Sequence, residues 1–403
     1  MPRQSSRIRI RAGAIAALLL TSLSLAASSV RAGDKPDVDY AEMTLEQLMA
    51  IPVHAASKRD QKATEAPSSV TLITSQDIRT YGWRTLGDLL RSTPGFYVSN
   101  PRTYGFLGVR GFGRPGDFGG RILVLVNGHR LNDPLYDTAA IVDDFILDMD
   151  LIDRVEVVRG PGSALYGNNA FFAIVNIIMK RGDQIQGIEA SGESATYDSY
   201  RGRLTLGVNA EGGTEALLSA SGYTSQGNPE VYYPEFGTSL RDGDGESAHR
   251  FGVSLGRGGF TLEAFYVGRD KDAPPGYGTT PALPRHTFDG RAYAEGRYER
   301  RLTETETLMA RAYYDWYEYL GKYTYDLAEP GEPAVLSINR DESIAESVGG
   351  EVQFNWRLHR QHSATLGADY RNDFRQMMKN FDEEPRVDYL DIDPQTRIVG
   401  LFV

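Results

Sequence analysis

Several short segments contain residue types whose spacing could serve chemistry. Gly111-Phe-Gly113-Arg-Pro-Gly116 has the spacing G-x-G-x-x-G of a dinucleotide-binding turn, and residues 160–167 are a second glycine-rich segment. A dinucleotide site needs a helix that begins at the glycines, so that its amide groups face the pyrophosphate. Pro115 and the β-rich continuation do not predict such a helix, and residues 160–167 lack the Lys-Ser/Thr of a phosphate loop. We therefore predict no nucleotide site.

Histidines and acids do not predict a metal centre or a catalytic site either. The six His are scattered, and the close pair His359 and His362 is predicted to point to opposite faces of a strand. Asp143-Asp144 and Asp148-Met-Asp150 have the residue types of calcium ligands or catalytic acids, but we interpret them as solvated surface. Because no nucleophile stands in a recognisable pattern with a base, we predict no enzyme, no metal and no cofactor.

The composition excludes further classes of protein. The 403 residues include no Cys, which excludes disulfides, thiolate zinc sites, iron–sulfur clusters and thiol catalysis. The formal net charge of −11 argues against a nucleic-acid partner, which would require a basic face. No 18-residue apolar run follows the first 30 residues, so no transmembrane helix is predicted there. A membrane barrel remains open, because alternating strands keep the mean hydropathy low.

The N-terminus has the pattern of a secretory signal peptide. Four arginines within residues 3–11 precede an apolar, small-residue stretch at 12–27, and Val30 and Ala32 stand at positions −3 and −1 of a cut before Gly33. We predict that residues 1–32 are removed on export, and the alternative is an N-terminal membrane anchor. Export combined with the absence of Cys is typical of a bacterial envelope protein.

The chain changes character near residue 183. Before it, we expect a compact α+β domain with strands at 69–73, 121–126, 155–158 and 174–179, a capped helix from Ser75 and a second helix over 85–91. Asn127-Gly128 predicts a tight turn after one of these strands.

From Gln184 onward the hydrophobic period is two. In residues 347–357, for example, Val348 and Val352 share one face while Glu351 and Gln353 share the other. Strands of a soluble sandwich are typically about 5–6 residues long. Strands of about ten residues, apolar on one face and charged on the other, predict a transmembrane antiparallel β-barrel.

The connections between these strands alternate in length. Tight turns are expected at 210–213, 256–259, 302–305 and 358–360, and long polar loops at 225–247, 270–287, 321–344 and 376–394. This asymmetry is typical of outer-membrane barrels. Seven aromatic residues within 313–325 are interpreted as an aromatic girdle and mouth, and the alternative is a soluble β core.

These pieces, in this order, resemble a TonB-dependent outer-membrane receptor. Residues 155–170 read Val-Glu-Val-Val-Arg-Gly-Pro-Gly-Ser-Ala-Leu-Tyr-Gly-Asn-Asn-Ala and are similar to the family's plug domain, as are 88–95, 109–112, 123–128 and 174–180. Phe172-Ala173 and Met179 depart from the family pattern, which affects local packing only. The resemblance implies a signal peptide at 1–32, a periplasmic segment with a TonB box at 33–62, a plug at 63–182 and a partial β-barrel at 183–403.

The resemblance places the TonB box at residues 51–57, which are Ile51, Pro52, Val53, His54, Ala55, Ala56 and Ser57. An extended, unanchored segment can be captured by β-augmentation, with Ile51, Val53 and Ala55 as one alternating set of side chains. Pro52 lacks an N–H, which limits pairing at that position. The alternative is a plain linker. Residues 33–50 are too few for the extra signalling domain of transducer members, so we predict no transcriptional signalling.

The resemblance also implies a function. A ligand would bind outside, at barrel loops and at plug tips predicted at 99–120 and 131–140, and TonB of the inner-membrane energising complex would pull the box. We predict ligand contacts at Arg102, Tyr104, Arg114 and Tyr136, because planar cations and aromatic rings suit anionic or aryl chelates. The alternative is that these four are solvated loop residues. The implied partners are TonB, a small-molecule metal chelate and outer-membrane lipid.

The barrel is expected to be incomplete. About ten strands are predicted in 183–403, whereas the resemblance implies about 22, and lipid does not tolerate an open sheet edge. Three functions are left open: uptake of a ferric siderophore or similar metal chelate, uptake of cobalamin, haem or a carbohydrate by the same architecture, and a truncated non-transporting remnant or surface binding module. An enzyme would need a triad across the barrel mouth.

Overall fold

The computed structural model of the chain describes residue 43 and residues 51–55, 57–59, 61–62, 68–113, 116–185, 187–210, 212–234, 237–273, 283, 285–329, 332–359 and 362–403. The predicted signal peptide at 1–32, Ala56 of the predicted TonB box and the predicted ligand contact Arg114 lie outside these ranges. No helix among the described residues is long and apolar enough to cross a membrane.

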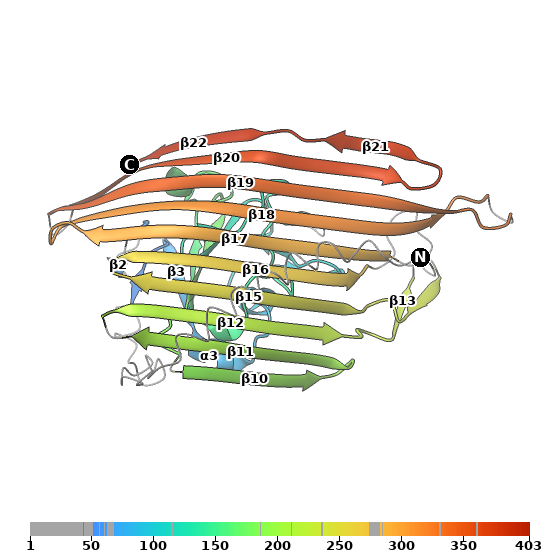
Figure 1. Ribbon diagram of the computed structural model, residues 1–403, viewed down its shortest axis with the longest axis horizontal. Helices are drawn as coiled ribbons and strands as arrows, with labels where there is room; N and C mark the ends of the chain where they lie inside the picture. Colours follow the sequence, from blue (N-terminus) through green and yellow to red (C-terminus); the bar gives the residue numbers. More distant parts are fainter. Residues whose placement is uncertain are drawn as a thin grey trace.

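A large antiparallel sheet forms the front layer of the molecule (Figure 1). Its strands, in chain order, are β10 (Gly187–Ala195), β11 (Ser199–Ala210), β12 (Thr214–Ser225), β15 (Glu246–Arg257), β16 (Phe260–Asp272), β17 (Arg285–Arg301), β18 (Glu306–Asp326), β19 (Leu336–His359), β20 (His362–Asp382), β21 (Val387–Ile392) and β22 (Thr396–Phe402). Each pairs with its neighbour in this order, except that β21 and β22 pair with different parts of β20. The eleven strands therefore occupy ten positions, as predicted from the period of two.

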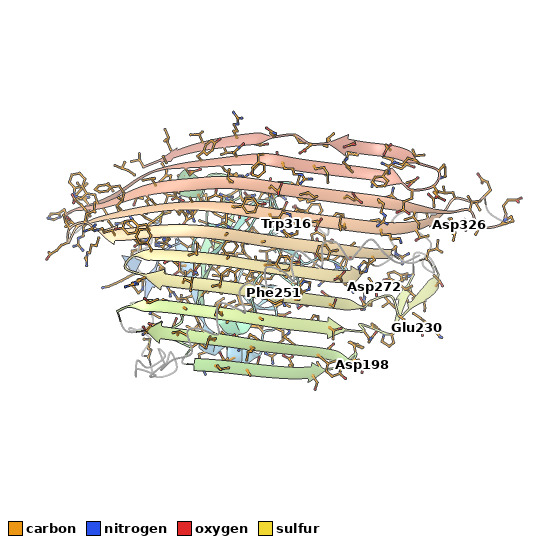
Figure 2. The ribbon with its side chains drawn as sticks, viewed as in Figure 1. Asp198, Glu230, Phe251, Asp272, Trp316 and Asp326 are labelled. Atoms are coloured by element: carbon orange, nitrogen blue, oxygen red, sulfur yellow. The ribbon has the colours of Figure 1, made fainter. Side chains whose placement is uncertain are left out.

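On this sheet apolar side chains are exposed on one face and polar side chains are buried on the other, the reverse of a soluble protein. Leu204 is 56% exposed, whereas its strand neighbours Arg203 and Thr205 are buried. Phe251 and Trp316 belong to the face that looks away from the smaller unit (Figure 2). Apolar residues that are exposed while charged ones are buried are expected of strands whose outer face meets lipid. The predicted alternation is confirmed.

The strands are longer than predicted. β18, β19 and β20 have 21, 24 and 21 residues, so the predicted loops 321–344 and 376–394 are largely strand. The prediction is wrong there because backbone pairing continues beyond the apolar band, where no hydrophobic alternation marks a strand. The predicted loop 225–247 contains a hairpin of β13 (Glu230–Tyr233) and β14 (Thr238–Arg241).

The short turns and the longer loops lie at opposite ends of the sheet, to the left and right in Figure 1. The aromatic row of β18 divides between the two faces. Tyr314 is partly exposed on the outer face, while Tyr317 and Tyr319 are buried on the inner one. Of the seven aromatic residues, two, Tyr314 and Trp316, lie on the outer face and five on the inner face, so most of the row is not a lipid-facing girdle.

A smaller α+β unit lies behind the large sheet (Figure 1). Its five-stranded sheet has the order β3 (Ser69–Thr74), β8 (Ile152–Arg159), β9 (Ala173–Met179), β6 (Ile122–Val126) and β7 (His129–Arg130). The other elements are β4 (Phe96–Ser99) paired with β5 (Phe106–Val109), the helices α3 (Ser75–Tyr81), α4 (Leu86–Arg91) and α5 (Ser163–Tyr166), and the 3-10 helix η2 (Met149–Leu151). The four predicted strands and two predicted helices are present. We call this unit the plug and the large sheet the barrel wall.

Both predicted helices begin at a capping box. Thr74 with Asp77 caps α3, and Thr85 with Asp88 caps α4. The first helix begins at Ser75, as predicted, and its N-cap is the preceding residue, Thr74, which places the Asp77 carboxylate at the third helical position, where it can accept the N-cap N–H.

The plug core is continuous with the barrel wall. The largest apolar cluster contains Leu89 and Phe145 of the plug together with Phe265, Val267 and Tyr293 from β16 and β17. The inward face of the wall therefore does not surround an empty lumen. Apolar burial, the dominant favourable term in folding, joins the two units.

The segment that connects plug to wall runs close to the wall backbone. A Cβ at Gly207 of β11 would collide with the Ile185 backbone, and one at Gly182 would collide with the Ala216 backbone. Side chains are therefore excluded at this crossing, whereas a Cβ at Gly202 on the same strand would meet nothing within 4 Å.

We expect Gly207→Ala to lower the stability of the folded protein by about 1–3 kcal/mol, since the collision is with backbone that cannot rotate away. Thermal unfolding followed by circular dichroism in detergent micelles measures this. Gly202→Ala is the matched control and should unfold as the wild type does. Equal unfolding of the two variants would contradict the close crossing.

Candidate functional site

The predicted TonB box is docked against the plug. β1 (Pro52–Val53) pairs antiparallel with β2 (Gln61–Lys62), and Val53 and Ala55 are fully buried. The backbone N–H groups of His54 and Ala55 both donate to the Glu156 carboxylate, at 3.0 Å. The prediction that this segment is unanchored is therefore wrong.

Glu156 is the anchor of this segment. It lies on β8, is fully buried, and also accepts hydrogen bonds from Arg154, at 3.2 Å, and from Asn176, at 3.3 Å. A buried carboxylate requires such partners, because an unpaired charge in the interior costs several kcal/mol. The available sequence signal was a lone Glu inside the apolar run at 155–158, since charged residues are almost never fully buried unless they are paired.

Lys58, which follows the box, is bound to the barrel wall. Its Nζ lies 2.7 Å from Oε1 of Glu351 on β19, and Gln353 donates to its backbone carbonyl. Both members of the ion pair are buried. Burial lowers the pKa of Lys58, and the neighbouring Glu351 carboxylate opposes that shift.

The turn between β6 and β7 is the second attachment of plug to wall. Arg311 of β18 donates to the Gly128 carbonyl at 2.7 Å and to the Glu351 carboxylate, which also binds Lys58. His129 contributes both ring nitrogens: Nδ1 lies 2.8 Å from Glu295, and Nε2 lies 2.9 Å from Asp315.

The charge on His129 depends on these two carboxylates. Burial alone lowers the pKa of His129, but Asp315 and Glu295 outweigh burial and raise the pKa from 6.5 to about 9. The ring is also stacked on Tyr293, with centroids 4.1 Å apart. An imidazolium that donates to a carboxylate on each side satisfies the buried ring, the buried Glu295 and the partly exposed Asp315.

Two of the predicted ligand contacts lie together at the plug–wall interface. The Tyr104 hydroxyl donates to Asp289 at 2.9 Å, and the Tyr136 hydroxyl lies 3.0 Å from Ser343 Oγ. Both tyrosines pack against the buried pair Tyr317 and Tyr319 of β18. Burial raises the pKa of both phenols, so they are neutral hydrogen-bonding groups near pH 7.

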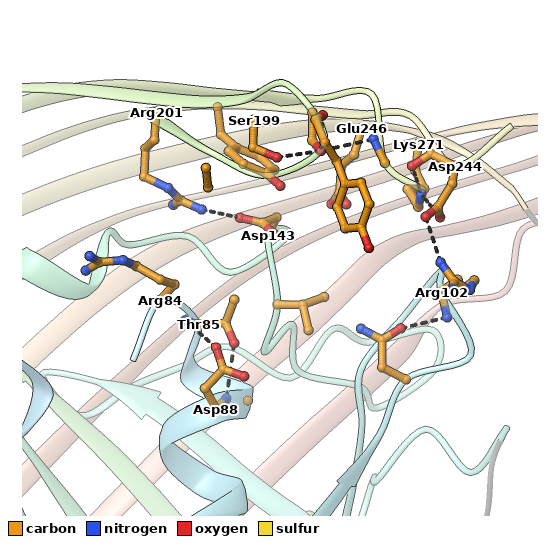
Figure 3. A pocket seen from close by; sticks show the side chains of 18 of the residues that line it. Arg84, Thr85, Asp88, Arg102, Asp143, Ser199, Arg201, Asp244, Glu246 and Lys271 are labelled. Atoms are coloured by element: carbon orange, nitrogen blue, oxygen red, sulfur yellow. Dashed lines mark hydrogen bonds and ion pairs between the residues drawn. The ribbon is translucent and has the colours of Figure 1, made fainter. Parts of the chain in front are cut away.

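The third described candidate, Arg102, lies at a separate cavity of about 640 Å³ between the plug and the strands β10–β16 (Figure 3). Its NH1 lies 2.8 Å from the Asp244 carboxylate. Across the cavity, Arg201 of β11 pairs with Asp143 of the plug, also at 2.8 Å. Sequence reasoning missed the wall residues of this cavity, because strand register places them opposite plug residues about 60 to 140 positions away.

Within the described ranges, no group of three or more His, Asp or Glu residues could hold a metal ion. His359 and His362 are cross-strand partners beside the β19–β20 turn, with ring centroids 6.2 Å apart. The prediction that they point to opposite faces is wrong, because the turn places them on two strands instead of one.

Comparison with known proteins agrees with this architecture. Residues 62–174 match the sequence model of the family described as TonB-dependent Receptor Plug Domain. The chain is 29% identical over 189 residues to the vitamin B12 transporter BtuB of Vibrio vulnificus, an alignment that covers 46% of this chain and 29% of that protein. It is 31% identical over 128 residues to the iron-regulated outer membrane virulence protein of Vibrio cholerae, covering 31% of this chain and 19% of that protein.

Solved structures share the fold at low sequence identity. The ferripyoverdine receptor of the outer membrane of Pseudomonas aeruginosa superposes with a TM-score of 0.63 at 14% identity, over 87% of this chain and 51% of that chain. The ferric-catecholate import receptor Fiu of E. coli superposes with a TM-score of 0.59 at 15% identity, over 83% of this chain and 53% of that chain. The chain thus spans about half the length of these structures and less than a third of the curated relatives.

A plug packed into the charged inner face of a sheet whose outer face is apolar defines an outer-membrane β-barrel protein with an internal plug. Residues 62–174 are a TonB-dependent receptor plug domain, and the chain shares the fold of the plug and part of the barrel of outer-membrane receptors.

We expect Glu156→Ala to release residues 51–55 from the plug. Two hydrogen bonds to a buried carboxylate are lost, each worth about 1.5–3 kcal/mol, so tryptic cleavage after Lys58 or Arg59 should accelerate about tenfold or more. Glu189→Ala, which removes an acid that pairs with Arg203 on the wall, is the control and should leave cleavage unchanged. Identical cleavage of both variants would show that Glu156 does not hold the segment.

The His129 contacts should weaken at high pH. Since the pKa is raised in the folded state, the stabilisation is complete below pH 6.5 and is lost as the pH rises through about 9; it amounts to about 3 kcal/mol. Thermal unfolding at pH 6 and pH 10 measures the loss. His129→Gln should reduce that pH dependence, and a variant that keeps the full dependence would contradict the assignment to His129.

Proposed function

We propose that the protein containing this chain is an outer-membrane receptor for TonB-energised uptake of a ferric siderophore or similar metal chelate. The observation that carries the proposal is that the docked segment 51–58 and the cavity beside Arg102 lie at opposite ends of one plug. Residues 51–58 dock near the short-turn end, through Glu156 and Glu351, while Arg102 and the cavity lie towards the loop end. A ligand that reaches one end and a pulling protein that reaches the other would both act on the plug.

The docked segment explains why energy would be needed. TonB would capture residues 51–57 by β-augmentation, which requires Val53 and Ala55 to leave their buried positions. Breaking two hydrogen bonds to Glu156 and the buried Lys58–Glu351 pair costs on the order of 5–10 kcal/mol. Spontaneous release would therefore be rare, and mechanical work from the inner-membrane complex would supply the difference.

Similar proteins favour a metal chelate as ligand. The structures that share the fold include a ferripyoverdine receptor and a ferric-catecholate import receptor, and one curated relative is an iron-regulated outer membrane protein. The relationship to a vitamin B12 transporter supports cobalamin as a second candidate. The lining of the cavity by arginine, lysine and tyrosine side chains suits the anionic or aryl oxygens of a siderophore.

The domain limits at 63–182 and 183–403, the TonB box at 51–57 and the ligand contacts Arg102, Tyr104, Arg114 and Tyr136 belong to this proposal. The partly buried positions of Tyr104 and Tyr136, with their hydrogen bonds to the wall, support a role in fixing the plug tips to the wall, beside the ligand. Arg102 is exposed on the cavity and is the candidate best placed to meet a ligand directly.

We expect deletion of residues 51–57 from the full native protein to abolish energised uptake of a radiolabelled ferric chelate, while binding of that chelate to cells persists. The segment is far from the cavity, so its loss should spare the ligand site. Wild-type cells treated with an uncoupler serve as the control, because they should bind without uptake in the same way. Unchanged uptake by the deletion variant would refute the box assignment.

A further inference from the structure

One carboxylate joins three parts of the molecule at the rim of the cavity. Asp244 lies in the segment 226–245, which connects β12 to β15 and includes the β13–β14 hairpin. Its carboxylate binds Arg102 of the plug, at 2.8 Å, and Lys271 of β16, at 2.9 Å (Figure 3). It also accepts the backbone N–H of Asn228, at 3.0 Å.

The side chain of Lys271 and the backbone of Arg102 each have a further contact besides the Asp244 carboxylate. Lys271 is buried, and its Nζ donates to the backbone carbonyls of Asp244 and Gly245 as well. Arg102 has a left-handed backbone (φ 71°), and its N–H donates to the Asn100 side chain at 2.8 Å. A non-glycine residue in this conformation needs local support, which the Asn100 turn provides.

The segment 226–245 closes on itself around Asp244. A Cβ at Gly227 would collide with the Asp244 backbone, and the Asp242 N–H donates to the Pro229 carbonyl at 3.1 Å. Movement of the Asp244 side chain would therefore free the segment from the plug tip. It would also break the hydrogen bond from the Asn228 N–H, while the contact between Asp242 and Pro229 would remain. The side chain is partly exposed to the cavity, at 15%, so a ligand can reach it.

We propose that the ligand of this cavity carries an anionic oxygen group that replaces the Asp244 carboxylate on Arg102 and Lys271. This inference rests on the proposed function and names its ligand class. The exchange unties the segment 226–245 from the plug tip, so that ligand binding is sensed by both the loop and the plug.

The physical reason is that the exchange keeps both cations paired, while the displaced Asp244 carboxylate, which is partly exposed, would be hydrated in the open cavity. An anionic ligand group satisfies the same two donors that Asp244 occupies, whereas an uncharged or cationic ligand would leave Asp244 in place and the loop attached. The other acid–base pairs of the cavity lie outside the segment 226–245. Glu246 binds Arg269 on the neighbouring strand, Arg84 binds Glu193, and Arg201 and Arg250 share Asp143 and Asp148. An exchange of partners at Asp244 would therefore change how the segment 226–245 is attached.

The ionisation of Asp244 agrees with this role. Burial favours the neutral acid, but the Asn228 N–H, Lys271 and Arg102 outweigh burial and lower the pKa of Asp244. The carboxylate is therefore charged at neutral pH, and it competes directly with an anionic ligand.

The test uses the full native protein and three ferric chelates of different charge: ferric citrate, which is anionic, ferrichrome, which is uncharged, and ferrioxamine B, which is cationic. Isothermal titration calorimetry measures binding of each. We expect the wild type to prefer ferric citrate. Asp244→Asn removes the competitor and should tighten binding of ferric citrate about three- to tenfold, while Arg102→Gln should weaken it about tenfold.

Asp242→Asn is the matched control, because it removes the same charge from the same segment two residues away, and it should bind as the wild type does. Asp244→Asn keeps the shape of the side chain, so we expect this variant to fold normally. Thermal unfolding checks that it does. A wild type that prefers ferrichrome or ferrioxamine B, or an Asp244→Asn variant with unchanged or weaker binding of ferric citrate, would overturn the inference.

The outcomes separate this inference from the proposed function. If ferrichrome or ferrioxamine B is taken up in an energised manner and ferric citrate is not bound, the inference of an anionic ligand is overturned and the proposed uptake of a metal chelate is supported. If none of the three chelates binds to any variant, both the anionic class and uptake of a metal chelate are overturned.

Discussion

The structure depends on pairing the buried charges that point inward from the barrel wall. Much of the outer face of the wall is apolar, and buried charged side chains such as Arg203, Glu295 and Glu351 face inward, against the plug. Charges buried there without partners would cost several kcal/mol each. Glu351 with Lys58 and Arg311, and His129 with Glu295 and Asp315, satisfy that requirement across the interface. The plug is held by these pairs as well as by the shared apolar core.

This constraint also determines how the plug can move. A transport cycle that broke the pairs outright would expose unpaired charges, whereas a cycle that exchanges partners would not. At the loop end, Asp244 is placed to give up Arg102 and Lys271 to an anionic group. At the other end, the two N–H groups that Glu156 holds are backbone donors, which β-augmentation by a pulling protein would satisfy in turn. In the proposed cycle, both ends of the plug would exchange one set of partners for another.

Local patterns predicted the elements well, because their signals are local. The hydrophobic period of two predicted which residues lie on each face of the wall and how many strand positions it has. Asn127-Gly128 predicted the turn that carries His129 to the wall, and both residues have the positive φ that this turn requires. The ends of β18–β20 could not be predicted, because these strands continue beyond the apolar band, where no alternation of apolar and polar residues marks a strand.

The partners across the interface were beyond the reach of sequence patterns. Lys58 and Glu351 are 293 residues apart, and their contact depends on the register of every strand between β10 and β19. A slip of one residue would turn Glu351 outward. The docking of the predicted TonB box was missed for the same reason, although the isolated Glu156 in an apolar strand was a signal that something polar must lie beside it.

The central claim is that residues 51–58 are held inside the protein until they are pulled. Because the chain has no Cys, spin labels can be placed uniquely at Ile51→Cys and at Thr303→Cys, on the β17–β18 turn of the wall. Pulsed electron paramagnetic resonance then measures the distance between them in unliganded protein in outer membranes. The docked arrangement predicts one narrow distance distribution, which should broaden when Glu351→Gln is added. A broad distribution in the otherwise unchanged protein would show that the segment is free, and would contradict the account.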